Sequence, residues 1–341
     1  MIWSRIRGLG VAFPERVVTN DDLTQWMDTS DEWIRQRTGI RQRYWAEFDD
    51  RTSSSDLAKI ATEQALEEAG LAPEEVDLFL FATLSPDASY PGSACFLQQK
   101  LGVGGAAALD IRQQCTGWIY GMSIADQFVR SGQYKNVLLV GAEVQSKTLD
   151  VSTRGRAMTV LFGDGAGAAV FSATELSSDL PPDAADSRVL SCHLHADGRF
   201  VDELLWRAPG SSNRVWNPPE LVEAPEAYPQ MNGRLVFQHA VKRMPEVAFE
   251  ALEAHGLTPD DVDLFVNHQA NKRIDDRFAA AMGVSQDKVV STIEHFGNTT
   301  AATIPIGLFE ARKAGRLQPG MLVCSAAFGA GFTWGAALYR W

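Results

Sequence analysis

An internal repeat restricts what this chain can fold into more than any other feature of its sequence. Residues 65–83 read ALEEAGLAPEEVDLFLFAT, and residues 251–269 read ALEAHGLTPDDVDLFVNHQ, with identical residues recurring in register. In each copy a glycine suited to the left-handed conformation ends a helix, a proline stops the helix from continuing, and an apolar run is typical of a buried strand. Two copies of one helix–turn–strand unit predict two halves built alike.

A second pair of segments supports the first, in the same order along the chain. Residues 162–171 (FGDGAGAAVF) resemble residues 328–338 (FGAGFTWGAAL), and both place a glycine-rich turn ahead of an apolar strand. The polar, proline-containing stretch 177–188 is typical of a connection between units. We therefore expect an N-terminal half over 1–176 and a C-terminal half over 188–341.

The remaining sequence alternates helical and strand patterns. Residues 56–70 have helical apolar spacing, residues 135–143 have the pattern of a strand, and residues 305–329 indicate helix, turn and strand. This alternation predicts a layered α/β fold. The aperiodic segment 208–231 is long for a loop in a compact domain, which indicates a functional or mobile segment.

Composition excludes several classes of protein. The 341 residues are 45% hydrophobic and 22% charged, as in ordinary globular proteins, and the formal net charge of −12 disfavours nucleic acid and anionic membranes as partners. No apolar run approaches the length of a signal peptide or a membrane span. The four cysteines have no zinc spacing. We expect a cytoplasmic, reduced enzyme without a metal or cofactor.

Cys115 is the best candidate nucleophile. It stands between LDI, which has the pattern of a strand end, and TGWIYGMSIADQFV, which has helical spacing. At a helix N-terminus, free N–H groups and the macrodipole favour the thiolate, which is the reactive form of cysteine. The alternative is an ordinary buried cysteine.

Two further side chains fall at comparable junctions. His268 follows a strand expected to run to Asn267, at the sheet edge where α/β sites collect, although a structural histidine would fit as well. Asn298 lies in a turn before a helix, where it could simply be a cap. The repeat offset carries position 115 into this same turn, so we expect equivalent turns of the two halves to meet.

The glycine-rich turn near the C-terminus can bring backbone N–H groups to a substrate. Gly329-Ala330-Gly331 suits an oxyanion hole, although a plain tight turn is the alternative. Asp164 is interpreted as a structural turn cap. Cys324, inside an apolar strand, is interpreted as core.

The chain resembles β-ketoacyl-acyl carrier protein synthase III of the thiolase superfamily over nearly its whole length. The blocks that carry the resemblance lie at residues 29–40, 162–170, 193–198, 231–237, 268–274, 296–303 and 328–338. The resemblance implies a five-layer αβαβα thiolase-like fold of two similar halves, and a homodimer.

The resemblance also implies roles for the candidate residues. Cys115 corresponds to the acylated nucleophile, completed by His268 and Asn298, and the N–H groups of Cys115 and Ala330 to the oxyanion hole. Acyl-coenzyme A would load Cys115. Malonyl-acyl carrier protein would then lose carbon dioxide and condense with the acyl group, giving a 3-oxoacyl-carrier protein.

Further residues match binding positions of that family. Trp33, Arg37 and Arg154 or Arg156, with Asn271, correspond to the coenzyme A site. The stretch Gln269, Ala270, Asn271, Lys272 and Arg273 corresponds to the carrier-protein contact, to which Arg277 would add positive charge.

Several positions depart from the family pattern around the acyl pocket. Gln113 and Gln114 precede the nucleophile where small residues are usual, Trp118 replaces the more frequent Phe, and Ala330 replaces a glycine. Tyr90 matches a bulky residue that reaches into the neighbouring subunit's acyl pocket. Together with the long 208–231 segment, these departures predict an acyl primer longer than acetyl or otherwise unusual.

Three other activities remain open from the sequence. The chain could be an acyltransferase of the same fold that acts on an oxygen or nitrogen nucleophile. It could be a non-catalytic partner subunit, although the presence of all three candidate catalytic residues argues against this. Head-to-head condensation of two acyl-coenzyme A molecules would need a carboxylate base, which the sequence does not reveal.

Overall fold

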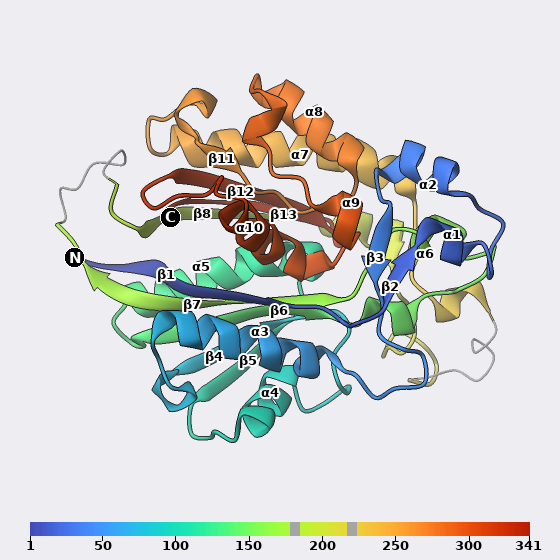
Figure 1. The fold of residues 1–341 in the computed structure, drawn as a ribbon, viewed down its shortest axis with the longest axis horizontal. Helices are drawn as coiled ribbons and strands as arrows, with labels where there is room; N and C mark the ends of the chain where they lie inside the picture. The colour runs from blue at the N-terminus through green and yellow to red at the C-terminus, as the bar shows by residue number, and fades with distance from the viewer. Residues whose placement is uncertain (178–184, 217–223) are drawn as a thin grey trace.

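The computed structural model describes residues 1–177, 185–216 and 224–341. Within them, two stacked β-sheets alternate with helices in five layers (Figure 1). The first sheet has the order β1-β7-β6-β4-β5 and the second the order β11-β12-β13-β8. The first sheet comprises β1 (Ile2–Ala12), β4 (Leu78–Ala82), β5 (Ala107–Ile111), β6 (Asn136–Glu143) and β7 (Gly165–Glu175). The second comprises β8 (Arg188–Ala196), β11 (Leu264–Phe265), β12 (Leu322–Gly329) and β13 (Thr333–Arg340).

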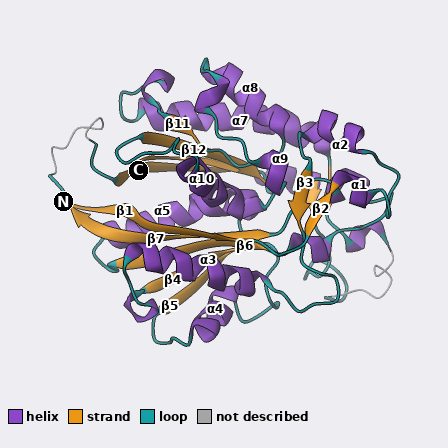
Figure 2. Cartoon of the chain, viewed as in Figure 1, coloured by secondary structure: helices purple, strands orange, loops and turns teal. Residues whose placement is uncertain are grey.

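Helices cover both outer faces and fill the space between the sheets, as Figure 2 shows. The outer layers hold α3 (Ser54–Ala69) and α4 (Ser93–Leu101) on one side, and α7 (Gly233–Glu253) and α8 (Lys272–Met282) on the other. The central layer holds α5 (Gly117–Arg130) and α10 (Thr303–Lys313). One buried apolar cluster joins both sheets through these two helices, so the halves share a core.

Short elements gather at the end of the molecule away from the termini (Figure 1). They are β2 (Val17–Thr19), β3 (Gln42–Tyr44), α1 (Asn20–Leu23), α2 (Asp31–Thr38), α6 (Arg156–Thr159), α9 (Ile293–Phe296), β9 (Leu204–Leu205) and β10 (Gln230–Met231). None of the helices in the described part of the chain is both long and apolar enough to cross a bilayer.

The sequence repeat corresponds to equivalent elements of the two sheets. α3 is followed by Gly70 and the chain after α7 turns at Gly256, both with positive φ, and a proline-initiated 3₁₀ turn then leads into β4 or β11. β4 lies beside β6 and β11 beside β12 in matching positions. The expected thiolase-like arrangement of two similar halves is therefore confirmed. The connection predicted at 177–188 falls largely outside the described residues.

The strand expected to run to Asn267 is shorter than predicted, since β11 ends at Phe265. The chain still follows β12, because the N–H groups of Val266 and His268 donate to Cys324 and Ala326. At Asn267 the side-chain Oδ1 accepts the Ala326 N–H at 3.0 Å. Here a side-chain oxygen takes the place of a backbone carbonyl as the acceptor. The regular pairing of β11 with β12 therefore ends, while His268 stays in register beside β12.

Two equivalent 3₁₀ turns meet between the sheets, as the repeat predicts. One is η2 (Gln114–Thr116), which leads into α5, and the other is η9 (Thr300–Ala302), which leads into α10; the two turns are in contact. Gln114 (φ 45°) and Thr300 (φ 48°) are the non-glycine residues with positive φ in the described part of the chain. They occupy corresponding positions in the two turns, and this conformation stores strain that often marks functional sites.

Candidate active site

A cavity of about 920 Å³ opens beside the two turns. Cys115, Gln114 and Thr300 line it from the turns, and Ala330 and Gly331 line it from the C-terminal glycine-rich turn. Cys115 is therefore not sealed in the core, although only 9% of the residue is exposed.

The nucleophile candidate lies where the sequence predicts, between β5 and α5. Gly329 packs against it so closely that a Cβ there would come within 2.9 Å of Cys115 Cβ. Burial, with a smaller contribution from the negative charge of Glu143, raises the pKa of Cys115 to about 12. Burial therefore opposes the ionised thiolate expected from the helix N-terminus, because desolvation of the sulfur outweighs the local N–H groups.

His268 is fully enclosed and neutral. Burial lowers its pKa to about 4, against an opposing effect of the Thr300 carbonyl. Nδ1 lies 2.8 Å from Thr303 Oγ1, whereas the buried Nε2 has no hydrogen-bond partner among the described residues. An unpartnered ring nitrogen is costly in a core, so Nε2 is the atom available for chemistry.

Asn298 is held by hydrogen bonds of its backbone N–H, its backbone carbonyl and its side chain. Its N–H donates to Leu161 at 2.8 Å, its carbonyl accepts from Gly163 at 3.1 Å, and Oδ1 accepts the Thr300 N–H at 2.8 Å. The acceptor end of the amide is therefore occupied. Nδ2 donates to no described residue and remains available to a ligand, which goes beyond the simple cap considered from the sequence.

Threonine hydroxyls tie the C-terminal turn to the nucleophile turn. Thr333 Oγ1 lies 3.0 Å from the Ala330 carbonyl and 2.8 Å from the hydroxyl of Thr116, the residue after Cys115. The Ala330 N–H donates to no described backbone acceptor. The turn thus presents a backbone donor at the cavity wall, as an oxyanion hole requires.

Glu143 is a buried carboxylate that the sequence analysis missed. It ends β6, is 0% exposed, and accepts from Thr83, Leu84, Ser85 and Thr300. Burial raises its pKa to about 7 against these hydrogen bonds. An acidic residue closing the apolar strand 135–143 was the available signal, because such a group is rarely buried without a role.

The residues expected at a coenzyme A site form a surface stack. The guanidinium carbons of Arg37 and Arg156 lie 4.3 Å and 4.6 Å from the ring centroid of Trp33. Arg154 pairs with Asp150 at 2.5 Å and lies over the ring of Tyr228 at 5.6 Å. Aromatic and guanidinium groups are therefore gathered on one surface, which suits an adenine ring and phosphates.

The stretch expected to contact a carrier protein is only partly accessible. Gln269 is 1% exposed and bonds to the backbone of Asn267, Val290, Thr292 and Ile293, so its expected surface contact is wrong.

Asn271 uses both ends of its amide within the protein. Its Oδ1 caps α8 by accepting from Arg273 N–H, and its Nδ2 donates to the Arg37 carbonyl. Lys272 pairs with Asp276, while Arg273 and Arg277 are exposed and Ala270 is half-buried.

The three residues expected in the acyl pocket have different positions. Gln114 lines the cavity. Trp118 is 0% exposed within the shared core and does not line the cavity, so its expected pocket role is wrong. Trp118 lies in the first turn of α5 and packs into the layer between the two sheets. Tyr90 is 86% exposed and does not line the cavity, and its contact with a neighbouring subunit stays a prediction.

The irregular segment 208–231 reaches the cavity. Pro209, Trp216 and Pro229 line it together with Trp206, while residues 217–223 lie outside the described residues. The segment therefore forms a wall of the candidate site.

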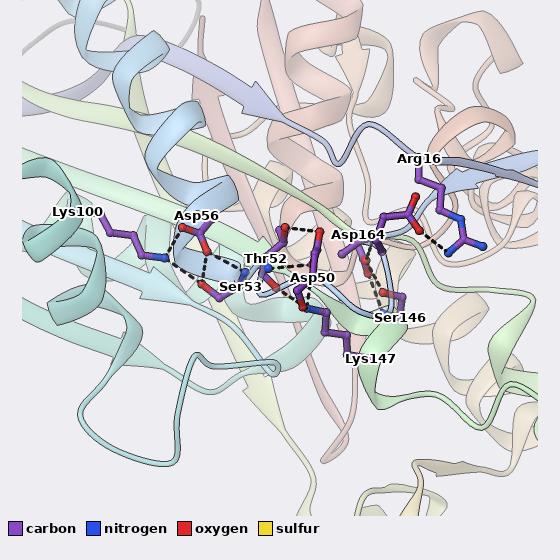
Figure 3. A network of polar contacts seen from close by, with 11 residues as sticks. Arg16, Asp50, Thr52, Ser53, Asp56, Lys100, Ser146, Lys147 and Asp164 are labelled. Carbon is purple, nitrogen blue, oxygen red and sulfur yellow. Dashed lines mark hydrogen bonds and ion pairs between the residues drawn. The ribbon is translucent and has the colours of Figure 1, made fainter.

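A polar network includes Thr52, Ser53 and Lys147 of the cavity lining (Figure 3). Lys147 donates to the Asp50 and Thr52 carbonyls at 3.0 and 2.9 Å, and Lys100 donates to Ser53 at 3.0 Å. Asp164 accepts from the N–H groups of Ala46 and Ser146 and from the Ser146 hydroxyl. The structural role expected for Asp164 is confirmed, as is the buried position of Cys324.

Metal ligation finds no support in the described ranges. No three His, Cys, Asp or Glu side chains gather there as a metal ion would need.

Comparisons with known proteins agree with this geometry. Residues 109–198 match the family described as 3-oxoacyl-[acyl-carrier-protein] synthase III, and residues 252–341 match its C-terminal domain. The chain is 45% identical over its full length to a β-ketoacyl-[acyl-carrier-protein] synthase III of Xanthomonas campestris, of which 99% is covered. It is also 45% identical to the protein of that name from Rhodospirillum centenum, over 99% of each chain.

Solved structures extend the comparison. The crystal structure of 3-oxoacyl-[acyl-carrier-protein] synthase III from Aquifex aeolicus superposes with a TM-score of 0.87 at 40% identity, covering 99% of this chain and all of that one. The priming β-ketosynthase of the R1128 polyketide pathway superposes with a TM-score of 0.86 at 33% identity, covering 99% and 96%.

The paired sheets and the cysteine at a strand–helix junction define an acyl-transferring enzyme of the thiolase fold. Within that class, the chain belongs to the β-ketoacyl-acyl carrier protein synthase III family.

Proposed function

We propose that the protein catalyses a decarboxylating Claisen condensation between an acyl-coenzyme A primer and malonyl-acyl carrier protein, through an acyl-Cys115 intermediate. The observation that carries the proposal is that Cys115 lines the cavity together with Thr300 and Ala330. Asn298 is hydrogen-bonded to Thr300 and His268 to Thr303, and neither Asn298 nor His268 itself lines the cavity. The polar atoms without a partner among the described residues are His268 Nε2, Asn298 Nδ2 and the Ala330 N–H.

In the first half-reaction the Cys115 sulfur attacks the acyl thioester carbonyl. Because the resting pair is a thiol and a neutral imidazole, the proton moves from sulfur to His268 Nε2 as the new C–S bond forms. The backbone N–H groups of Cys115 and Ala330 stabilise the tetrahedral oxyanion. Collapse breaks the C–S bond to coenzyme A, whose sulfur takes the proton back from His268.

In the second half-reaction malonyl-carrier protein enters the emptied cavity. Asn298 Nδ2 and His268 Nε2 donate to the malonyl thioester carbonyl, and the C–C bond to carboxylate breaks as carbon dioxide leaves. The enolate carbon then attacks the acyl carbonyl, the C–S bond to Cys115 breaks, and the departing thiolate takes up from solvent the one proton that the condensation consumes. In the first half-reaction the Thr303 hydroxyl donates to the Thr300 carbonyl and accepts from Nδ1–H, which leaves Nε2 free to take up the proton. In the second half-reaction Nε2 donates only with its proton on that nitrogen, so the Thr303 hydroxyl must turn from the Thr300 carbonyl to Nδ1.

The binding partners follow from the same proposal. The Trp33–Arg37–Arg156 stack would hold coenzyme A, and the exposed Arg273 and Arg277 on α8 would meet an acidic carrier protein. A homodimer is supported by the open edge of β5, the last strand of its sheet, on which Leu109 is 43% exposed.

The cavity supports a primer longer than acetyl. Its volume of about 920 Å³ is larger than a two-carbon group would fill, and Trp206 and Trp216 give it apolar walls that suit a longer acyl chain.

The experiment measures the two half-reactions separately. Intact mass after incubation with acyl-coenzyme A of increasing chain length reports loading, and trapped carbon dioxide from labelled malonyl-carrier protein reports condensation. We expect one acyl adduct, largest with medium chains, that persists in Cys95→Ala and is lost in Cys115→Ala. Cys95 is an exposed cysteine and makes a matched control.

Other outcomes would overturn the proposal in distinguishable ways. Failure to load any primer would indicate a non-catalytic partner subunit. Loading followed by transfer to a hydroxyl or amine without carbon dioxide would indicate the acyltransferase reading. Condensation from acyl-coenzyme A alone would indicate head-to-head chemistry, and faster turnover of acetyl than of longer primers would refute the long-primer part.

A further inference from the structure

Glu143 is a buried carboxylate paired only with neutral donors. It accepts from the Thr83 hydroxyl at 3.1 Å, from the Leu84 and Ser85 N–H groups at 3.2 and 3.1 Å, from the Ser85 hydroxyl at 2.6 Å and from the Thr300 hydroxyl. No Lys or Arg forms an ion pair with it among the described residues. Such an arrangement anchors what it binds, because releasing any donor would leave a buried group unsatisfied.

Thr300 connects this anchor to Asn298 and His268, the two side chains proposed to act with Cys115. Its hydroxyl donates to Glu143, its N–H donates to Asn298 Oδ1 at 2.8 Å, and its carbonyl accepts from the Thr303 hydroxyl at 2.9 Å. The same Thr303 oxygen lies 2.8 Å from His268 Nδ1. One residue therefore orients the amide of Asn298 directly and the ring of His268 through one hydroxyl.

The backbone at Thr300 needs an anchor to keep this geometry. A β-branched residue with φ of 48° is strained, and such conformations persist only where the surroundings hold them. The turn also approaches β6 closely, since a Cβ on Gly141 would lie 2.6 Å from the Ala301 carbonyl. Glu143 stands two residues beyond Gly141 and supplies the hydrogen bond at this contact.

We propose that Thr300, anchored by Glu143 of the first half, is the positioning residue that holds Asn298 and His268 of the second half ready for the decarboxylation step. The inference rests on the proposed condensation. It assigns neither Thr300 nor Glu143 to the reacting atoms, and it explains why a carboxylate is buried behind the cavity wall.

Glu143 also affects the nucleophile through its charge. Its carboxylate raises the pKa of Cys115, in addition to the larger effect of burial. The elements packed on Glu143 are the chain after β4, which contributes Thr83 to Ser85, and η9. These contribute no other titratable side chain, so Cys115 is the titratable group of the site whose pKa responds to its charge.

The first test replaces the Thr300 side chain while keeping its backbone. Thr300→Val loses the hydroxyl at nearly constant volume, and Thr300→Ser retains it. Thr299→Val is the matched control, because the buried Thr299 hydroxyl has no partner among the described residues.

We expect Thr300→Val to slow carbon dioxide release from malonyl-carrier protein roughly ten- to a hundredfold, since small displacements of donors cost that much. Loading of Cys115 by acyl-coenzyme A should fall by a smaller factor, because loading uses His268 alone whereas decarboxylation uses both His268 and Asn298. Thr300→Ser should recover most of the loss. Equal rates in Thr300→Val and wild type, or equal loss in both half-reactions with Thr299→Val behaving the same, would overturn the inference.

The second test separates anchoring from charge at Glu143. Glu143→Asp keeps the charge but shortens the reach to Thr300, so condensation should fall while the pH profile of Cys115 alkylation keeps its midpoint. Glu143→Gln removes the charge, so that midpoint should move to lower pH. Unchanged profiles in Glu143→Gln and unchanged condensation in Glu143→Asp would contradict the proposal.

Folding and the proposed function are checked in the same samples. Thermal unfolding of each variant excludes global loss of structure, and the threonine variants decide the question if Glu143→Gln does not fold. A wild-type protein that does not load primer or release carbon dioxide refutes the proposed function itself. A fully active wild type with an equally active Thr300→Val refutes only the positioning role.

Discussion

At the scale of single residues, burial acts on Cys115 and His268 in opposite directions. It raises the pKa of the thiol to about 12 and lowers that of the imidazole to about 4, so both are neutral at pH 7. A neutral pair avoids two unpaired charges in a desolvated site. The Cys115 thiol then loses its proton to His268 only as its sulfur attacks the substrate carbonyl, so reaction requires bound substrate.

The histidine makes stability depend on acidity. The folded pKa of about 4 lies below the ordinary 6.5, so between these values the unfolded chain binds a proton that the folded chain refuses. The free energy of unfolding should therefore fall as pH drops from 6.5 towards 4, by up to roughly 3 kcal/mol from this group. Urea unfolding at several pH values should show that the free energy of unfolding of His268→Asn changes less with pH than that of the wild type. The same change with pH in both proteins would contradict this prediction.

At the scale of elements, the site depends on how closely three turns approach one another. η2 and η9 meet between the sheets, and Gly329 at the end of β12 packs against Cys115 without room for a side chain. Glycine is required there for close approach, since no unusual φ is present at this position.

Adding one methyl group tests this contact. Gly329→Ala would place a Cβ 2.9 Å from Cys115 Cβ, so the nucleophile or the turn must shift. We expect a loss of about 1–3 kcal/mol in unfolding free energy and slower acylation of Cys115. Gly104→Ala is the control, because a Cβ there meets nothing within 4 Å. Wild-type loading rates in Gly329→Ala, measured by intact mass, would contradict the packing argument.

The sequence predicted elements better than the directions of their side chains. The repeat and the strand–turn–helix pattern located the Cys115 turn and its equivalent at Thr300, because glycine, proline and apolar runs act locally. The family resemblance implied functional surface positions for Gln269 and Trp118, whereas both are buried. Their burial depends on which layer covers each element, and this is decided by contacts between segments far apart in the chain.

Glu143 illustrates the same limit for the site. Its partners come from the chain after β4 and from η9, which lie about 60 and 157 positions away in sequence. No local pattern links these segments. Only the packing of the two halves brings the carboxylate behind Thr300.

At the scale of the whole molecule, the first sheet ends in an unpaired strand. β5 pairs with β4 on one side, and no strand among the described residues pairs with its other edge. Leu109 on this strand is 43% exposed and the nearby chain carries the 86% exposed Tyr90. An apolar open edge invites pairing with another strand, which supports association through β5.

A charge on this edge tests the association. If the proposed dimer forms through β5, Leu109→Lys should raise its dissociation constant by more than about tenfold in sedimentation or light scattering, since burying an unpaired ammonium is costly. Ile60→Lys, at another exposed apolar residue on the outer helix α3, is the control. A Leu109→Lys protein of unchanged mass would show that β5 is not the interface.

The contact between the two strained turns also restricts how the sequence of such a chain can evolve. Gln114 belongs to the first copy of the duplicated unit and Thr300 to the second, and a carboxylate of the first copy restrains the second. Neither copy holds a complete set of reactive groups. A substitution at this contact in one half therefore requires a compatible residue in the other half. The two halves share an architecture, but their sequences must evolve together at this contact.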